Sequence, residues 1–412
     1  MQLTDLREVI RAQQEQVAKQ TAELSRDMLP DLPDIQTYAL IITGIRRCGK
    51  STLLRQFARK LRGKYFYLNF DDLRLADFTA RDFPLLDSLI LESGVKTLLL
   101  DEIQMAPRWE AYARQKLDEG FQVLLTGSNA ALLSRELGTK LTGRHITKEL
   151  FPFSYQEFLR FTKRGAGVKS LDQYLRVGGF PEYLKTKRPE VLNQLQQDIL
   201  YRDIAVRYGL RDVASLKRLF VYLVSNAAHL VSPSKLTGVI GLRSHTTVLE
   251  YLSYFEEAYL LQLVPRFAWS VKKQNLAPKK LYVGDAGLLR SVSVSFTPDR
   301  GGLLENFVFN ELRRRTRDIF YFADKTGECD FIVDPHGGNP LCAQVCLELT
   351  LDNRDREING LLAALDFFKS KRGVIITRDT RDVIVRADRR IEVLPAWDKR
   401  LSALCDQDNK RR

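Results

Sequence analysis

The chain has 412 residues, which exceeds one ordinary hydrophobic core and predicts two to four domains. Apolar residues make up 44% and charged residues 28%, and no apolar stretch approaches the roughly 18 residues of a membrane span or resembles a signal peptide, so we expect a soluble, cytoplasmic protein. The net charge of +13 favours a polyanionic partner such as nucleic acid.

The first 37 residues are expected to form a helical segment. Leucine, isoleucine and valine recur at helical spacing between residues 3 and 17, among glutamine, arginine and glutamate. One face of this helix is therefore apolar, and we expect it to pack on the domain that follows. Pro30 and Pro33 mark the break before the first strand.

An apolar run at 39–42 leads directly into a complete G-x-x-x-x-G-K-[ST] motif, followed by a helical run over 52–61. In such a motif, backbone N–H groups surround a phosphate, the lysine reaches its oxygens and the hydroxyl is a ligand for Mg²⁺. The sequence therefore predicts a site for ATP and Mg²⁺; the alternative is an ordinary strand-to-helix turn. The expected nucleotide-binding residues are Gly44, Ile45, Arg46, Arg47, Cys48, Gly49, Lys50, Ser51 and Thr52, with Lys50 also counted as catalytic and Ser51 as a metal ligand.

Strand patterns at 38–43, 64–70, 97–100, 121–126 and 145–150 are separated by helical patterns. This alternation predicts an α/β fold with a parallel sheet covered on both faces. In such sheets the ligand lies beyond the carboxyl ends of the strands, where the motif is expected.

Two acidic residues follow the third strand. Asp101 is placed to hold Mg²⁺, and Glu102 to orient and deprotonate the attacking water. The alternative, a merely solubilising pair of acids, is weakened by the phosphate motif upstream. After the fourth strand, Asn129 or Ser128 is placed to contact the γ-phosphate or the water, although a turn or helix cap fits equally well.

These motifs together resemble a family of predicted AAA+ ATPases that end in a nuclease-like domain, the domain of unknown function 4143 type. The resemblance rests on the phosphate motif and on the segments 100–104, 126–129, 141–144, 151–154, 178–182 and 201–204, and so spans nearly the whole chain. It implies a P-loop AAA+ core, a helical lid and a ring-like homo-oligomer. It also implies that Arg144 is an arginine finger for a neighbour's ATP site; the alternative is a salt bridge at a helix end.

Residues 216–267 read as helices followed by a β-ribbon, the outline of a winged helix. Its recognition helix would begin at Ser244, and the hairpin that follows would carry Lys272, Lys273, Lys279 and Lys280. This layout suits non-specific DNA binding through phosphate. The alternative is a module that docks protein.

The last segment resembles, in outline, a PD-(D/E)xK nuclease-like domain. Glu305 and Asp330 match its acids, but Gln344 and Cys346 stand where an acid and a lysine belong, so nuclease activity is not expected. Glu348, on the same strand face, and Lys325 are the residues that could restore it. The five cysteines are scattered, which favours reduced thiols.

The predicted function is Mg²⁺-dependent ATP hydrolysis by an oligomer that acts on or near DNA. The alternatives are an ATP-loaded switch that gates a protein partner and an ATP-dependent nuclease. The predicted parts are an N-terminal helical segment, an ATPase core, a lid, a winged helix and a degenerate nuclease-like domain, at 1–37, 38–160, 161–214, 215–296 and 297–412.

Overall fold

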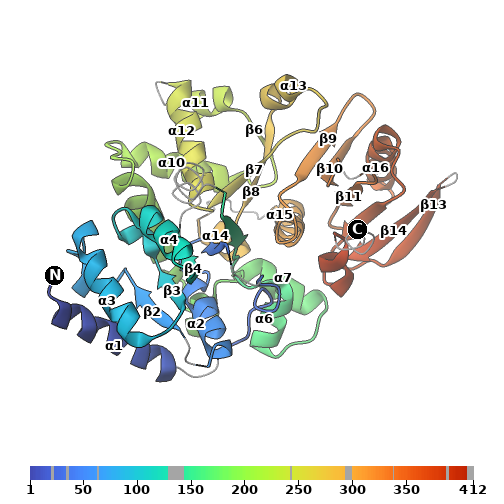
Figure 1. Ribbon diagram of the computed structural model, residues 1–412. Coiled ribbons are helices and arrows are strands. Elements are labelled where there is room, and N and C mark those ends of the chain that lie inside the picture. Colours follow the sequence, from blue (N-terminus) through green and yellow to red (C-terminus); the bar gives the residue numbers. More distant parts are fainter. Residues whose placement is uncertain are drawn as a thin grey trace. The chain divides into compact units, whose positions relative to one another are not determined.

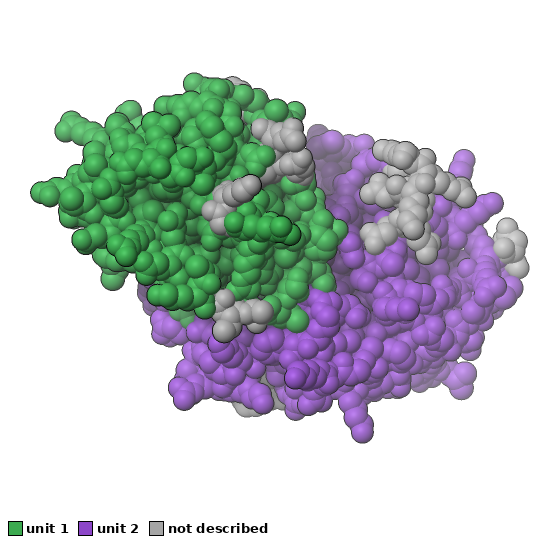
Figure 2. Space-filling view, turned by 60° about the horizontal axis from the view of Figure 1, so that its bottom comes forward, with its two compact units in different colours: residues 1–152, 257–259 green, residues 153–256, 260–412 purple. Residues whose placement is uncertain are grey.

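The computed structural model describes residues 1–19, 23–33, 37–62, 65–128, 143–241, 244–292, 299–336, 338–386 and 389–405. The chain divides into two compact units, coloured separately in Figure 2: residues 1–152 with 257–259, and residues 153–256 with 260–412. The cysteines are free thiols. Among the described residues, no helix is long and apolar enough to cross a membrane.

The first unit is built on a parallel five-stranded sheet in the order β2-β3-β4-β1-β5. Its strands lie where the apolar runs predict them, which confirms the α/β fold with a parallel core; they are β1 (Ala39–Thr43), β2 (Phe66–Asn69), β3 (Thr97–Asp101), β4 (Gln122–Thr126) and β5 (His145–Glu149). The helices between them are α2 (Lys50–Lys60), α3 (Phe83–Ser93) and α4 (Trp109–Asp118) (Figure 1). Strands β1, β4 and β3 are adjacent and parallel, so the carboxyl ends of β1 and β3, which carry the two motifs, lie on the same side of the sheet.

Helix α1 (Leu3–Lys19) packs on this sheet at its β2 edge, as expected from its apolar face. Leu6, Val9 and Ile10 are buried in the unit's core. The Gln13 amide donates to the Asn69 carbonyl (3.1 Å) and accepts from the Asn69 N–H (2.7 Å). The side chain thus satisfies backbone groups of an edge strand that would otherwise be free to pair with another chain.

The second unit begins with helices and continues with a small antiparallel sheet, in the order β6-β8-β7. The helices are α6 (Tyr155–Thr162), α7 (Val168–Val177), α8 (Pro181–Thr186) and α9 (Glu190–Asp198), the last continuing as a π-helix over Ile199–Val206. Next come α10 (Val213–Ser225), β6 (Leu230–Val231), α11 (Pro233–Ile240), α12 (His245–Glu257), β7 (Leu261–Val264), α13 (Val271–Leu276) and β8 (Lys279–Val283). The short helix α13 lies where a simple hairpin was expected.

The unit ends in a six-stranded mixed sheet, in the order β13-β14-β12-β11-β10-β9. Its elements are α14 (Ala286–Val292), α15 (Arg300–Arg313), β9 (Ile319–Ala323), β10 (Glu328–Val333), β11 (Leu341–Val345), α16 (Arg354–Phe368), β12 (Gly373–Thr377), β13 (Asp382–Arg386) and β14 (Arg389–Pro395). The order of elements through β12 is as predicted, while the hairpin β13–β14 was missed. Helix α16 packs against β10, β11 and β12, and α15 against β11 (Figure 1).

Candidate functional site

The phosphate motif forms a tight loop between β1 and α2. Gly44 has φ 143°, and a Cβ there would lie 2.0 Å from the Leu150 carbonyl oxygen, so only glycine fits. Gly49 caps α2 with φ 104°, in the left-handed region. The α2 amino end, with its free N–H groups, therefore opens at the carboxyl end of β1, which is the geometry of a phosphate site.

Lys50 is the buried cation of this loop, with 4% of its surface exposed. Its Nζ donates to the Gly44 and Ile45 carbonyl oxygens at 3.1 and 3.3 Å and lies 3.8 Å from Glu102 Oε1. The ammonium is thus held by its own loop and by the acid of the neighbouring motif. A bound phosphate offers charged oxygens in place of these weaker partners.

The two acids after β3 have separate environments. Asp101 is fully buried, and it accepts hydrogen bonds from Tyr67 Oη (3.0 Å), Thr126 Oγ1 and the Ser51 side chain. Glu102 is partly exposed, and its backbone is in the left-handed region, with φ 48° and ψ 45°. Non-glycine residues held in this region are often functional, because the surroundings must offset the strain.

The charge balance at Asp101 fits a nearby cation. Burial raises the pKa of Asp101, and the neighbouring Glu102 raises it further, while the three hydroxyl donors lower it. The Asp101 carboxylate and the Ser51 hydroxyl are in hydrogen-bond contact, and both offer the hard oxygen ligands that Mg²⁺ prefers. These two residues are therefore the ones that would hold Mg²⁺.

Sequence reasoning missed the groups that hold these residues in place. Arg26 is buried and donates to the Cys48 and Phe151 carbonyls, both at 2.7 Å. Gln104 Nε2 donates to Glu102 Oε2 at 2.5 Å, and the Glu102 N–H donates to Thr126 Oγ1 at 3.0 Å. Arg26 stands outside any motif, so only tertiary structure brings it to the loop; Thr126 and Gln104 belong to the quoted motif segments and could have been named.

Three further residues were predicted for the site, and the structure describes two of them, Ser128 and Arg144. Asn129 lies outside the described residues, and Ser128 is buried, with its Oγ 3.5 Å from Gln104 Nε2. Arg144 immediately precedes β5, at the sheet edge opposite the phosphate loop, and pairs with Asp118 at the end of α4. The helix-end salt bridge is therefore present, but both side chains are about half exposed, and such pairs contribute little stability.

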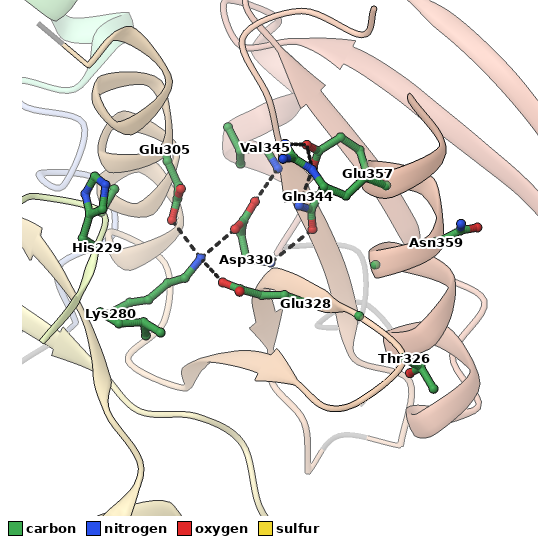
Figure 3. A pocket seen from close by; sticks show the side chains of 15 residues that line it. His229, Lys280, Glu305, Thr326, Glu328, Asp330, Gln344, Val345, Glu357 and Asn359 are labelled. Atoms are coloured by element: carbon green, nitrogen blue, oxygen red, sulfur yellow. Dashed lines mark hydrogen bonds and ion pairs between the residues drawn. The ribbon is translucent and has the colours of Figure 1, made fainter. Parts of the chain in front are cut away.

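A second site lies within the second unit: a pocket of about 780 Å³ between the small sheet and the C-terminal domain. Figure 3 shows Lys280 of β8 at its centre, with its Nζ 2.7 Å from Asp330, 2.9 Å from Glu328 and 3.3 Å from Glu305. Glu305 also accepts a hydrogen bond from Tyr282 (2.7 Å). Three carboxylates, one on α15 and two on β10, thus share one ammonium.

The structure around this pocket corrects three expectations. Lys280 was expected among the exposed, phosphate-binding lysines, but it is 4% exposed and neutralised by acids. Glu348 was expected on the face of β11 beside Gln344, but β11 ends at Val345 and Glu348 is exposed. Lys325 is also exposed and does not line the pocket; its place is taken by Lys280, and Gln344 instead donates to Glu357 of α16 at 2.7 Å.

The carboxyl group of Glu305 titrates in an unusual environment. Burial raises the pKa of Glu305 and the nearby Asp330 raises it further, while Lys280 opposes the shift. Across the described part of the chain, no group of three or more histidine, cysteine, aspartate and glutamate side chains is arranged to hold a metal ion.

Comparison with known proteins relates the chain to two families and two full-length relatives. Residues 36–159 match the family described as AAA domain, and residues 168–299 match a domain of unknown function, DUF8612. The chain is 31% identical over 413 residues to uncharacterized protein MJ1544 of Methanocaldococcus jannaschii, covering 93% of this chain and 92% of the relative. It is 30% identical over 353 residues to an uncharacterized protein of Haemophilus influenzae, covering 81% and 88%.

Two solved structures are also similar to this chain. AMPPCP-bound DnaA from Aquifex aeolicus shares 16% identity at a TM-score of 0.29, covering 61% of this chain and 88% of that one. The RuvB Holliday junction branch migration motor of Thermotoga maritima shares 19% identity at a TM-score of 0.28, covering 56% and 82%. The AAA-domain match, together with the loop geometry above, identifies the first unit as a P-loop ATPase-type domain.

The Lys280 cluster predicts a large stability effect. Lys280→Met leaves the buried carboxylates without a counter-ion, so we expect unfolding free energy to fall by about 3–5 kcal/mol in urea titrations at pH 7. Lys279→Met, on the adjacent and less buried position, is the control and should change stability by under about 1 kcal/mol. Adding Asp330→Asn to Lys280→Met should recover part of the loss; equal stability of the two methionine variants would contradict the assignment.

Proposed function

We propose that this chain, which belongs to the same family as MJ1544 of Methanocaldococcus jannaschii and has an AAA domain, is a Mg²⁺-dependent ATP hydrolase. The observation that carries the proposal is the convergence of Lys50, Ser51, Asp101 and Glu102 at one sheet edge. Each of these side chains is of the type that phosphoryl transfer to water requires.

In the proposed mechanism, the loop backbone from Gly44 to Thr52 binds the phosphates, and Lys50 neutralises the β and γ oxygens as charge develops on them. Ser51 and Asp101 would hold Mg²⁺, which would supply positive charge to stabilise the phosphate oxygens. The buried hydroxyls of Tyr67 and Thr126 keep Asp101 in one orientation. Catalysis then comes from positioning and charge rather than from a covalent intermediate.

Glu102 is the proposed general base for the attacking water. It is the less buried of the two acids, and its Oε2 is oriented by Gln104. Its distance of 3.8 Å from Lys50 Nζ supports a role beside the γ-phosphate, which Lys50 is proposed to bind. Asn129 or Ser128, after β4, is the proposed polar contact to the γ-phosphate.

The proposal includes an oligomer in which Arg144 acts on the neighbour's ATP. Arg144 lies at the amino end of β5, while the phosphate loop lies at the carboxyl end of the adjacent β1. A strand of five residues spans about 16 Å, so Arg144 does not reach the phosphates of its own loop. The exposed ion pair with Asp118 costs little free energy to break, so Arg144 can leave it at a subunit interface.

DNA is the proposed partner, contacted through a winged helix in residues 215–296. The order α10-β6-α11-α12-β7-α13-β8 supports this, because in a winged helix a pair of helices followed by β-strands presents its second helix, here α12, to a groove. Lys272 and Lys273 on α13 are exposed and would contact phosphate. The segment 161–214 is proposed as the lid of the ATP site.

Residues 297–412 are proposed to be a nuclease-like domain that has lost cleavage and serves in binding or scaffolding. Lys280 already neutralises Asp330, Glu305 and Glu328, so a divalent ion would have to displace a bound ammonium. Mg²⁺ sheds its waters reluctantly, which makes that exchange unfavourable. The rivals to the whole proposal are an ATP-loaded switch with negligible turnover and an ATP-dependent nuclease.

The ATPase proposal predicts different losses for two variants. Lys50→Ala should abolish ATP binding, because the buried cation of the loop is gone. Glu102→Gln should bind ATP but hydrolyse it at least about 100-fold more slowly, since only the base is removed. Phosphate release and equilibrium ATP binding measure the two effects, and Lys60→Ala at the exposed end of α2 is the control. Parent-rate hydrolysis by Glu102→Gln would refute the assigned base, and negligible turnover by the parent protein would favour the switch.

The arginine-finger proposal predicts complementation between inactive subunits. Arg144→Ala should lower turnover by about 10³-fold or more with ATP affinity nearly unchanged. Mixing Arg144→Ala with Lys50→Ala subunits should restore part of the activity, because each supplies what the other lacks. Asp118→Asn, which frees Arg144 without removing it, should remain active. Full activity in a strictly monomeric preparation, checked by particle mass, would exclude this role.

The non-cleaving proposal is tested directly on nucleic acid. We expect no products from linear DNA, circular DNA or RNA incubated with the protein in Mg²⁺ or Mn²⁺, because Lys280 occupies the acidic cluster. Products that persist in a Glu305→Ala/Asp330→Ala variant would come from a contaminant. Products that vanish in that variant would place the nuclease function first.

A further inference from the structure

A second pocket in the second unit, of about 390 Å³, has the opposite charge to the Lys280 pocket. Its walls come from α7, α14 and α15, which pack on one another, and from the residues that follow β11 and β12. The lining residues are Asp172, Leu175, Arg176, Arg290, Arg300, Leu303, Leu347 and Arg378. Four arginines thus line a pocket that contains a single carboxylate.

That carboxylate is already engaged. Asp172 accepts from Arg378 through both carboxylate oxygens, Oδ1 at 2.9 Å from Nε and Oδ2 at 2.5 Å from the terminal nitrogen. Among the described residues, Arg176, Arg290 and Arg300 have exposed side chains that make no hydrogen bond or ion pair. Arg378 and, at longer range, Arg300 and Arg176 all lower the pKa of Asp172, which shows how closely these charges gather around it.

Guanidinium groups that surround one shared carboxylate repel one another, and an added anion relieves that repulsion. A guanidinium group donates through a planar fork that matches carboxylate or phosphate oxygens. A phosphate group presents oxygens in several directions and can be shared among arginines from three helices, whereas a carboxylate is satisfied by one or two forks. The leucines on the walls add apolar surface for a sugar or base.

We propose that this pocket is a phosphate-binding site, occupied by the backbone of a nucleic acid or by the phosphates of a free nucleotide. It is separate from the ATP site, since all of its residues belong to the second unit and the phosphate loop belongs to the first. The inference goes beyond the proposed ATPase function and does not rest on it, because binding at this pocket requires neither hydrolysis nor α12.

The test measures binding by full-length protein without ATP. Anisotropy of a labelled 20-base-pair duplex is followed from 50 to 300 mM NaCl for the parent, for Arg176→Gln/Arg300→Gln and for the control Arg188→Gln/Arg390→Gln. The control removes the same charge from exposed arginines outside the pocket. We expect the pocket variant to bind at least about 10-fold more weakly, with a salt slope smaller by about 2, and the control to change under about 2-fold.

A variant of opposite sign strengthens the test. Asp172→Asn removes the internal competitor for the arginines, so we expect tighter binding, whereas Asp355→Asn, which frees the exposed Arg386, should leave affinity unchanged. Thermal melting of each variant shows whether the fold is intact. Tighter binding by Asp172→Asn, at an unchanged melting temperature, cannot arise from a damaged fold.

Two further arms identify the source of the phosphate. A fluorescent ADP analogue is titrated into Lys50→Ala protein with and without the two pocket substitutions, so that the phosphate loop does not contribute. A labelled polyglutamate peptide is titrated into the parent and into the pocket variant. Loss of analogue binding alone in the pocket variant assigns the site to free nucleotide; loss of duplex binding assigns it to nucleic acid. The proposal would be overturned if the pocket variant lost neither duplex binding nor analogue binding. It would also be overturned if the variant lost peptide binding to the same extent.

Discussion

The nucleotide site depends on the buried carboxylate of Asp101. A fully buried acid is stable in its charged form only when its oxygens are hydrogen-bonded, and here the donors come from α2, β2 and β4. Those three elements are brought around β3 only by the order β2-β3-β4-β1. The sheet topology therefore sets the distance between the phosphate loop and Glu102, and Thr126 joins the two acids by binding the Asp101 side chain and the Glu102 backbone.

In the second unit, the carboxylates of the Lys280 cluster also need partners, but here the partner is a cation rather than a set of hydroxyl groups. Its carboxylates are satisfied by a cation that belongs to the chain, delivered from a strand of the small sheet to acids on α15 and β10. A buried ion pair of this kind contributes little net stability, but removing one partner is costly. The cluster therefore makes the small sheet and the six-stranded sheet depend on each other for their stability.

Residues in local motifs could be predicted, and residues that act across the fold could not. The sequence predicts Lys50, Ser51, Asp101 and Glu102, because each motif directly follows in sequence the strand that positions it. Lys280 was assigned to the surface, because nothing near it in sequence reveals that its partners are 25 to 50 positions away. The hairpin β13–β14 was missed because β13 is an edge strand with mostly exposed side chains, so its apolar alternation is weak.

Ion pairs within the chain also determine which groups of the net charge of +13 can bind a partner. A cation that is paired with an acid of its own chain contributes little to phosphate binding, because the ion pair carries no net charge. Lys280 is shared by three acids, whereas the carboxylate of Asp172, which lies near Arg176 and Arg300, is already paired with Arg378. Lysine and arginine counts in the sequence therefore indicate the sign of the partner's charge, while internal pairing decides where on the molecule that partner binds.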